Sequence, residues 1–164
     1  MEYFSRVIYK IQSNPFFKWL SYEDKEHIAV VDFLNTEHPH VVFTHVPSEG
    51  KKTPFERFKH SLMGSKKGMC DFVILHPKFK VVEQGGVKMK QILYHGLVIE
   101  LKAPEHIREV KKGKDEGKMK KYKGVLSPEQ KVIIQQLNEV NYRAVPVWGA
   151  DEAIRELKEY LKNN

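Results

Sequence analysis

Two acidic residues and one lysine stand beside short apolar runs in the middle of the chain, and their types and spacing could carry chemistry. Asp71 directly precedes the run Phe72–Leu75, which is rich in β-branched residues and predicts a strand. A second run of the same kind ends with Glu100, Leu101 and Lys102. Because strand side chains alternate between faces, Glu100 and Lys102 point the same way and Leu101 points the opposite way.

Converging carboxylates next to buried strands are costly unless a cation neutralises them. Mg²⁺ is a hard cation that prefers oxygen ligands, and it binds one or two carboxylates together with water and phosphate oxygens. Lys102 would then orient or activate an attacking water, or stabilise developing negative charge. The alternative is structural, since Glu100 and Lys102 could simply form an ion pair on one sheet face.

The pattern of Asp71 followed by Glu100-x-Lys102 resembles the PD-(D/E)xK nuclease signature, and the surrounding sequence resembles its VRR-NUC (virus-type replication-repair nuclease) branch. The likeness runs from about residue 21 to residue 161. Three positions depart from the family pattern, with Cys70 in place of proline, Ser48 in place of asparagine and His27 in place of glutamine. The matching segments are residues 45–50, 63–71, 99–104, 126–130, 142–145 and 151–161.

This resemblance implies a restriction-endonuclease-like α/β fold, with a central mixed β-sheet flanked by helices. It implies Mg²⁺- or Mn²⁺-dependent hydrolysis of DNA phosphodiester bonds. Asp71 and Glu100 would bind the metal, with the carbonyl of Leu101 as a further ligand. Lys102 would orient the water nucleophile, and Gln130 would lie near the metal site and help to orient water or phosphate. An RNA substrate, or a non-catalytic nucleic-acid-binding protein on the same fold, stays an alternative.

A helix is expected from Ser21, an N-cap residue with Asp24 three positions later, to about Leu34. On this helix Glu23 falls near the middle of the expected apolar arc, and Glu26 falls at its edge. In the resembling family a glutamate of the first helix joins the metal site, and Glu23 aligns best with it. Glu26 is the alternative, and both could instead only favour the positive end of the helix dipole.

Lysines on both sides of the expected site are candidates for binding nucleic acid. A loop with glycines at both ends, Gly64–Gly68, leads into Asp71 and is expected to contact phosphate next to the cleaved bond. A solvated basic turn is the alternative. The residues expected to bind nucleic acid are Lys51, Lys52, Ser65, Lys66, Lys67 and, at a helix start, Lys131.

Two further basic stretches connect the expected strands. Residues 78–90 read as a connection with Gly85-Gly86 at its turn. Residues 102–123 carry nine basic residues against four acidic ones with few apolar residues, which indicates a mobile segment that follows a DNA backbone. A solvated loop is the alternative for this second stretch.

The segment Ser127-Pro-Glu-Gln130 predicts a helix start, with an N-cap, proline at the first helical position and glutamine at the capping-box position. Gln130 therefore has a structural reading as a cap and, by resemblance, a functional one at the metal site. The expected core face of this helix is Val132, Ile133, Leu137 and Val140. Other expected elements are a strand at 40–46, a helix at 54–63, a strand at 142–148 and a final helix capped by Asp151.

Composition sets the outer limits. The chain has 164 residues and a formal net charge of +7, which favours a polyanionic partner such as nucleic acid. We expect an aromatic-rich extension at 1–20 and one domain at 21–164. Its single cysteine excludes an internal disulfide and, with no signal peptide or apolar membrane span in view, indicates a cytoplasmic protein. By analogy with family members that act on branched DNA such as four-way junctions, we expect a homodimer paired through the aromatic extension. A phage or mobile-element origin fits the compact form.

Overall fold

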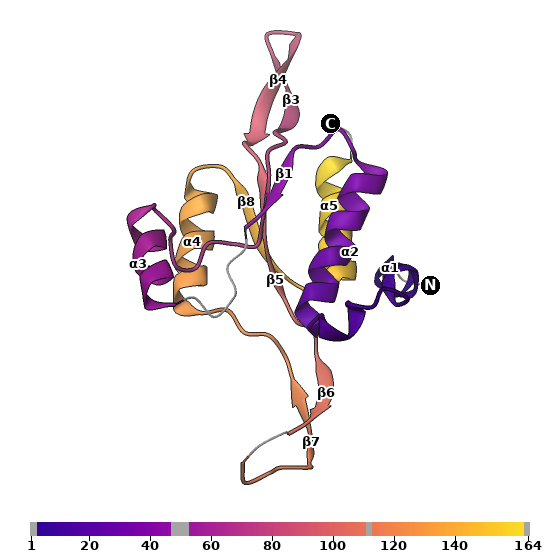
Figure 1. The fold of residues 1–164 in the computed structure, drawn as a ribbon. Helices are drawn as coiled ribbons and strands as arrows, with labels where there is room; N and C mark the ends of the chain where they lie inside the picture. The colour runs from indigo at the N-terminus through magenta and orange to yellow at the C-terminus, as the bar shows by residue number, and fades with distance from the viewer. Residues whose placement is uncertain (1–2, 47–52, 111–112, 163–164) are drawn as a thin grey trace. The chain divides into compact units, whose positions relative to one another are not determined.

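The computed structural model describes residues 3–46, 53–110 and 113–162, and it has the expected α/β fold with a central mixed sheet flanked by helices (Figure 1). The chain divides into two compact units. The first joins Met1–His40, Leu101–Val125 and Pro146–Glu159, and the second joins Val41–Glu100, Leu126–Val145 and Tyr160–Asn164. Within the described residues, no helix combines the length and the apolar composition that crossing a membrane requires.

The sheet has four strands in the order β1 (Phe43–His45), β2 (Phe72–Ile74), β5 (Leu97–Lys102) and β8 (Arg143–Trp148). β1 pairs antiparallel with β2, and β2 pairs antiparallel with β5. β8 runs parallel to β5, since the bonds from Arg143 N to Gly96 O and from Gly149 N to Lys102 O advance in the same direction along both strands. The other strands of the described residues form two separate hairpins, β3 (Lys78–Gln84) with β4 (Val87–Tyr94) and β6 (His106–Glu109) with β7 (Met119–Tyr122).

The helices and strands have the following bounds. The helices are α1 (Tyr3–Ile11), α2 (Tyr22–Glu37), α3 (Pro54–Leu62), α4 (Pro128–Glu139) and α5 (Ala150–Leu161), with a 3₁₀ turn, η1, at Phe17–Trp19. The strands are β1 (Phe43–His45), β2 (Phe72–Ile74), β3 (Lys78–Gln84), β4 (Val87–Tyr94), β5 (Leu97–Lys102), β6 (His106–Glu109), β7 (Met119–Tyr122) and β8 (Arg143–Trp148).

α2 begins as its sequence predicts, and its buried face includes Glu26 rather than Glu23. Ser21 Oγ accepts from Asp24 N at 3.0 Å, and Asp24 Oδ2 accepts from Ser21 N at 2.7 Å, which completes a capping box. The buried residues are Glu26, Ala29, Val30, Phe33 and Leu34. The apolar arc therefore includes Glu26, and the expectation that Glu23 lies near its middle is wrong, because Glu23 is only partly buried.

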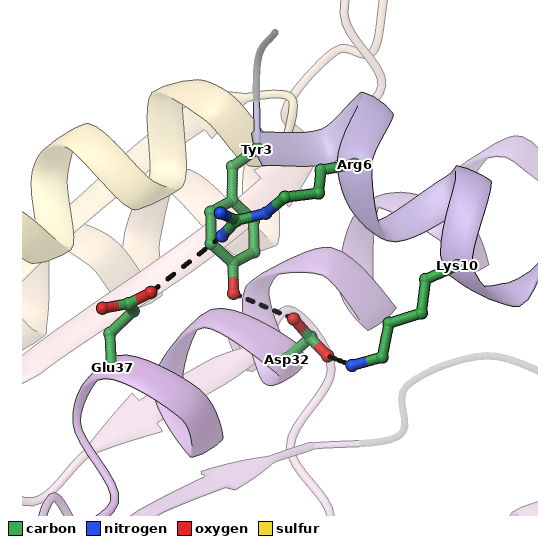
Figure 2. A network of polar contacts seen from close by, with 5 residues as sticks. All are labelled: Tyr3, Arg6, Lys10, Asp32 and Glu37. Atoms are coloured by element: carbon green, nitrogen blue, oxygen red, sulfur yellow. Dashed lines mark hydrogen bonds and ion pairs between the residues drawn. The ribbon is translucent and has the colours of Figure 1, made fainter.

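α1 packs on α2 through a small polar network in the first unit (Figure 2). The Tyr3 hydroxyl donates to Asp32 Oδ2 at 2.8 Å, and Lys10 Nζ donates to Asp32 Oδ1 at 3.1 Å. Arg6 Nη2 forms an ion pair with Glu37 Oε1 at 3.9 Å. Asp32 thus joins both ends of α1 to one turn of α2, so α1, which belongs to the aromatic extension, packs against α2 within the first unit.

α4 packs less completely than its sequence pattern predicts. Ile133 and Leu137, together with Ile134, contact a buried cluster that contains Cys70 and Val98. Val132 and Val140 are 51% and 57% exposed, so their assignment to the core face is wrong. The buried stripe of α4 is narrow because only one side of this helix faces the cluster.

Gly68 allows the loop before β2 to lie directly against the start of α4, which belongs to the same unit. Its φ is +83°, and a Cβ placed on it would lie 2.6 Å from Glu129 C and 2.8 Å from Gln130 N. Only glycine fits such a close contact with backbone atoms. The loop between α3 and β2 is thereby held against the first turn of α4, three residues before Asp71.

Other boundaries differ from the expectations. The strand expected at 40–46 is shorter, at Phe43–His45, because only these residues pair with β2. The basic stretch at 102–123 contains an antiparallel hairpin, β6–β7, that periodicity did not reveal because its strands are short and polar. Asp151 lies inside the first turn of α5, which begins at Ala150, so the prediction that Asp151 caps this helix is wrong.

We predict that Gly68→Ala is far more destabilising than Gly64→Ala. Both glycines have a φ of +83°, so both substitutions carry a left-handed backbone cost of about 1–2 kcal/mol. Gly64 faces open space, whereas Gly68 meets backbone. Urea unfolding should therefore show a further loss of at least about 2 kcal/mol for Gly68→Ala. Equal losses in the two variants would contradict the close approach at Gly68.

Candidate metal and nucleic-acid site

Two buried carboxylates lie on neighbouring strands of the second unit. Asp71 is 5% exposed and immediately precedes β2, and Glu100 is 1% exposed within β5. The register pairs Phe72 with Ile99, and one further step along it places Asp71 opposite Glu100. Residues that face each other on antiparallel strands have Cβ atoms about 4.5–5.5 Å apart. The topology thus brings together two acids that are far apart in the sequence.

Gln130 connects this carboxylate pair to the start of α4. Its Oε1 accepts from Ser127 N at 2.8 Å, and its backbone N donates to Ser127 Oγ at 3.2 Å. The same side chain donates from Nε2 to Glu100 Oε1 at 2.5 Å. Because the amide oxygen is used in the capping box, the amide NH₂ faces Glu100. Gln130 is therefore a cap and a contact of Glu100 at once.

Lys102 occupies the last position of β5. The two-residue period of a strand places its side chain on the same side of β5 as that of Glu100, with the fully buried Leu101 on the other side. Gly124 lies directly against Lys102, since a Cβ added at Gly124 would be 2.8 Å from Lys102 Cβ. The base of the lysine side chain is therefore held between its own strand and the residue that follows the β6–β7 hairpin.

His45 is a residue that sequence reasoning did not assign to the site. A ring nitrogen of His45 and a carboxylate oxygen of Asp71 lie within 4.8 Å of each other, a spacing that a shared metal ion can bridge. Val46 N also donates to Asp71 O at 2.7 Å, which fixes the end of β1 beside Asp71. The signals in the sequence are that His45 ends a short strand and begins one of the segments that match the family, but the pairing of that strand cannot be read from composition.

Glu26 is the buried carboxylate of α2, and it is engaged within the first unit. Its Oε2 accepts from Ala150 N, in the first turn of α5, at 2.5 Å, and the Tyr22 hydroxyl also bonds to it. Burial raises the pKa of Glu26, although these two hydrogen bonds oppose the shift. Burial and the neighbouring Glu26 raise the pKa of Tyr22 to about 12. Glu26 thus joins α2 to α5, and Glu23 remains the prediction for the helix carboxylate of the site.

The residues predicted to bind nucleic acid differ in their surroundings. Ser65, Lys66 and Lys131 are exposed. Lys67 Nζ forms an ion pair with Glu129 Oε1 at 2.5 Å, which lowers the pKa of Glu129 to about 2. This ion pair holds the loop after α3 against the first turn of α4. Lys51 and Lys52 lie outside the described residues.

The comparisons with known proteins support the fold. No protein-family model matches the sequence, and no curated protein matches it. Among solved structures, the chain is similar to a "VRR_NUC domain protein" with 23% sequence identity and a TM-score of 0.55. The match covers 87% of this chain and 90% of that chain. The expected resemblance in fold is therefore confirmed.

We predict that Glu26 makes folding less favourable as the pH rises. A raised pKa in the folded state means that the folded chain holds this proton more tightly than the unfolded chain does. The contribution is fully present below the ordinary pKa of 4.5 and is lost as the pH rises through the raised value. Glu26→Gln keeps an acceptor for Ala150 N but has no charge, so its free energy of unfolding should gain on the wild type as pH increases.

The measurement is urea unfolding of both proteins between about pH 4.5 and pH 7.5. The other charged groups near Glu26 are His27 and Asp151, and both are unchanged in the variant. The difference between the two stability curves therefore isolates the contribution of Glu26. Glu23→Gln on the same helix is the matched control. A constant difference between wild type and Glu26→Gln over this range would contradict the prediction.

Proposed function

We propose that this protein is a metal-dependent nuclease that hydrolyses DNA phosphodiester bonds. The observation that carries the proposal is the pair of buried carboxylates on adjacent strands, Asp71 and Glu100, with Gln130 bonded to the second. A solved structure of similar fold is named a VRR_NUC domain protein, and the net charge of +7 suits a polyanionic substrate.

The donor set fits a divalent cation. Carboxylate oxygens are ligands for Mg²⁺ and Mn²⁺, and two of them on one strand pair repel each other unless a cation or proton intervenes. Asp71 and Glu100 would hold the ion, with Glu23 and the carbonyl of Leu101 as further ligands. His45 adds an imidazole next to Asp71, and nitrogen ligands suit Mn²⁺ better than Mg²⁺. When bound, the ion polarises the phosphoryl oxygen and lowers the pKa of water.

The other residues of the proposed site have separate roles in orienting water, positioning Glu100 and binding DNA. Lys102 orients the attacking water and stabilises negative charge that develops on the phosphate. Gln130 donates to Glu100 Oε1 and so keeps this carboxylate in one orientation. Ser65, Lys66, Lys67 and Lys131, together with Lys51 and Lys52, are proposed to bind the phosphate backbone on either side of the cleaved bond.

We further propose that the nuclease is selective for branched DNA and acts as a homodimer. The N-terminal region offers an apolar surface for pairing, because Tyr9, Phe16 and Trp19 are 74%, 73% and 75% exposed. Single aromatic residues at this exposure are ordinary, but three within eleven residues form a candidate interface. The molecular mass in solution, measured for the wild type and for Tyr9→Ser/Trp19→Ser, tests the dimer. A monomeric wild type would overturn it.

We predict that Asp71→Asn and Lys102→Ala each abolish cleavage of DNA without unfolding the protein. Asp71→Asn keeps the shape of the side chain but removes the charge that would hold the ion. Lys102→Ala removes the group that orients the attacking water, and loss of a positioned proton-transfer group typically costs about 10²–10⁴-fold in rate. Gel assays with linear, single-stranded, flapped and four-way-junction DNA, in Mg²⁺, in Mn²⁺ and with chelator, provide the measurement. Circular dichroism and thermal melting check that each variant is folded.

The control substitution is Lys131→Ala, which should weaken DNA binding and leave cleavage at saturating DNA intact. Full activity of either Asp71→Asn or Lys102→Ala would refute the site. Binding of DNA by the wild type without cleavage in any metal would show a non-catalytic nucleic-acid-binding protein. Cleavage of RNA in preference to every DNA would change the substrate class.

A further inference from the structure

The β3–β4 hairpin is a long ribbon that is exposed on both faces. Its strands pair from Lys78 with Tyr94 to Gln84 with Val87, and Gly85 and Gly86 form the turn with φ of 60° and 78°. Only four of the fifteen strand residues are partly covered, and none is buried. An isolated two-stranded hairpin is marginally stable in water, so such a ribbon gains little stability from its own packing.

The base of this hairpin is nevertheless fixed firmly within the second unit. Lys78 Nζ donates to the carbonyl oxygen of Tyr160 at 2.7 Å, and the Tyr160 hydroxyl donates to the carbonyl oxygen of His76 at 2.9 Å. The centroid of the Tyr94 ring lies 6.3 Å from the centroid of the Tyr160 ring. Both strands are therefore anchored on the C-terminal end of α5 while the rest of the ribbon is exposed.

The charge of the exposed part is positive. Lys80, Lys88 and Lys90 are exposed and form no ion pair within the described part of the chain, and the hairpin has Glu83 as its single acid. The β6–β7 hairpin differs, although its sequence is more basic. There Asp115 pairs with Lys118 at 3.0 Å and with Lys120 at 2.5 Å, and so neutralises part of that charge.

Apolar side chains lie between these lysines. In the register of the ribbon, Phe79 faces Ile92 and Val81 faces Lys90, so these four residues share one face. Phe79, Val81 and Ile92 are 40%, 64% and 47% exposed. A two-stranded ribbon fits the major groove of DNA, where lysines reach phosphates and apolar side chains contact thymine methyl groups.

We propose, on the basis of the proposed nuclease function, that the β3–β4 hairpin is an arm that binds duplex DNA about one helical turn away from the cleaved bond. β3 follows β2 and β4 precedes β5, so the arm continues the same two strands that carry the acidic pair (Figure 1). Lys80 lies nine positions after Asp71, and Lys90 lies ten positions before Glu100.

These positions set the reach of the arm. At about 3.3 Å per residue, nine residues of extended chain span at most about 30 Å. Since DNA rises about 3.4 Å per base pair, this distance corresponds to roughly nine base pairs of duplex. The arm would thus require a duplex flank of a minimum length, which loop contacts next to the cleaved bond would not require.

The experiment measures binding with chelator present, by fluorescence anisotropy, to branched DNA whose duplex flanks are about 6, 10, 14 and 20 base pairs long. The arm variant is Lys80→Thr/Lys88→Thr/Lys90→Thr, in which threonine preserves strand propensity. The wild type should gain about 10- to 100-fold in affinity once the flank exceeds about 10 base pairs, and the arm variant should not. Its slope of log K against log salt should fall in magnitude by roughly two to three.

Two controls separate charge from position. Lys80→Arg/Lys88→Arg/Lys90→Arg should restore the length dependence, and Lys18→Thr/Arg155→Thr/Lys158→Thr, which removes the same charge elsewhere, should retain it. Wild-type affinity that does not depend on flank length, or an arm variant that matches the wild type, would overturn the arm. A change in solution mass with unchanged DNA affinity would also overturn it and would indicate that the hairpin contacts a second copy of the chain instead.

The outcome of this binding experiment does not depend on whether the protein cleaves DNA. Because binding is measured without divalent metal, absence of cleavage by the wild type would count against the nuclease and leave the length dependence readable. Conversely, active cleavage with no effect of flank length would count against the arm and leave the nuclease intact.

Discussion

The structure depends on how two carboxylates are held close together in a buried place. Asp71 and Glu100 stand opposite each other on β2 and β5, and both are almost fully removed from solvent. Two buried negative charges at such a spacing are unfavourable without compensation. The surrounding elements supply this in part, since Gln130 donates to Glu100 Oε1. In the proposed nuclease, a divalent cation would compensate the charge of both carboxylates.

The start of α4 contributes more to positioning the residues around the two carboxylates than to the buried core. Its buried surface is limited to one stripe, and no residue of the helix is fully buried. Its first turn, however, takes part in three separate contacts. Gly68 lies against its backbone, Lys67 pairs with Glu129, and Gln130 reaches Glu100. The helix start thereby joins the loop that leads into Asp71 to the strand that carries Glu100.

The distribution of positive charge is a second consequence of tertiary structure. Counting residues along the chain points to 102–123 as the most basic stretch, but several of its lysines are paired with acids of the same segment. Exposed surface ion pairs of this kind contribute little stability, yet they reduce the charge available to a polyanion. Lys80, Lys88 and Lys90 of the β3–β4 hairpin form no such pair within the described residues, so their charge is available to a polyanion although that stretch has fewer basic residues.

The sequence by itself determined much of the local structure, because local signals have local causes. The capping boxes at Ser21 and Ser127 mark the starts of α2 and α4, and the β-branched runs mark β2 and β5. The order of motifs was enough to indicate the fold, and the structural comparison bears that out.

Only the tertiary structure decided which of several similar residues is buried or lies beside the candidate site. Glu23 and Glu26 both lie near the apolar arc of α2, and the packing of α5 selects Glu26 for burial because Ala150 N requires an acceptor there. His45 comes close to Asp71 only through the pairing of β1 with β2. Such choices depend on partners distant in the sequence, and a pattern of neighbouring residues carries no information about them.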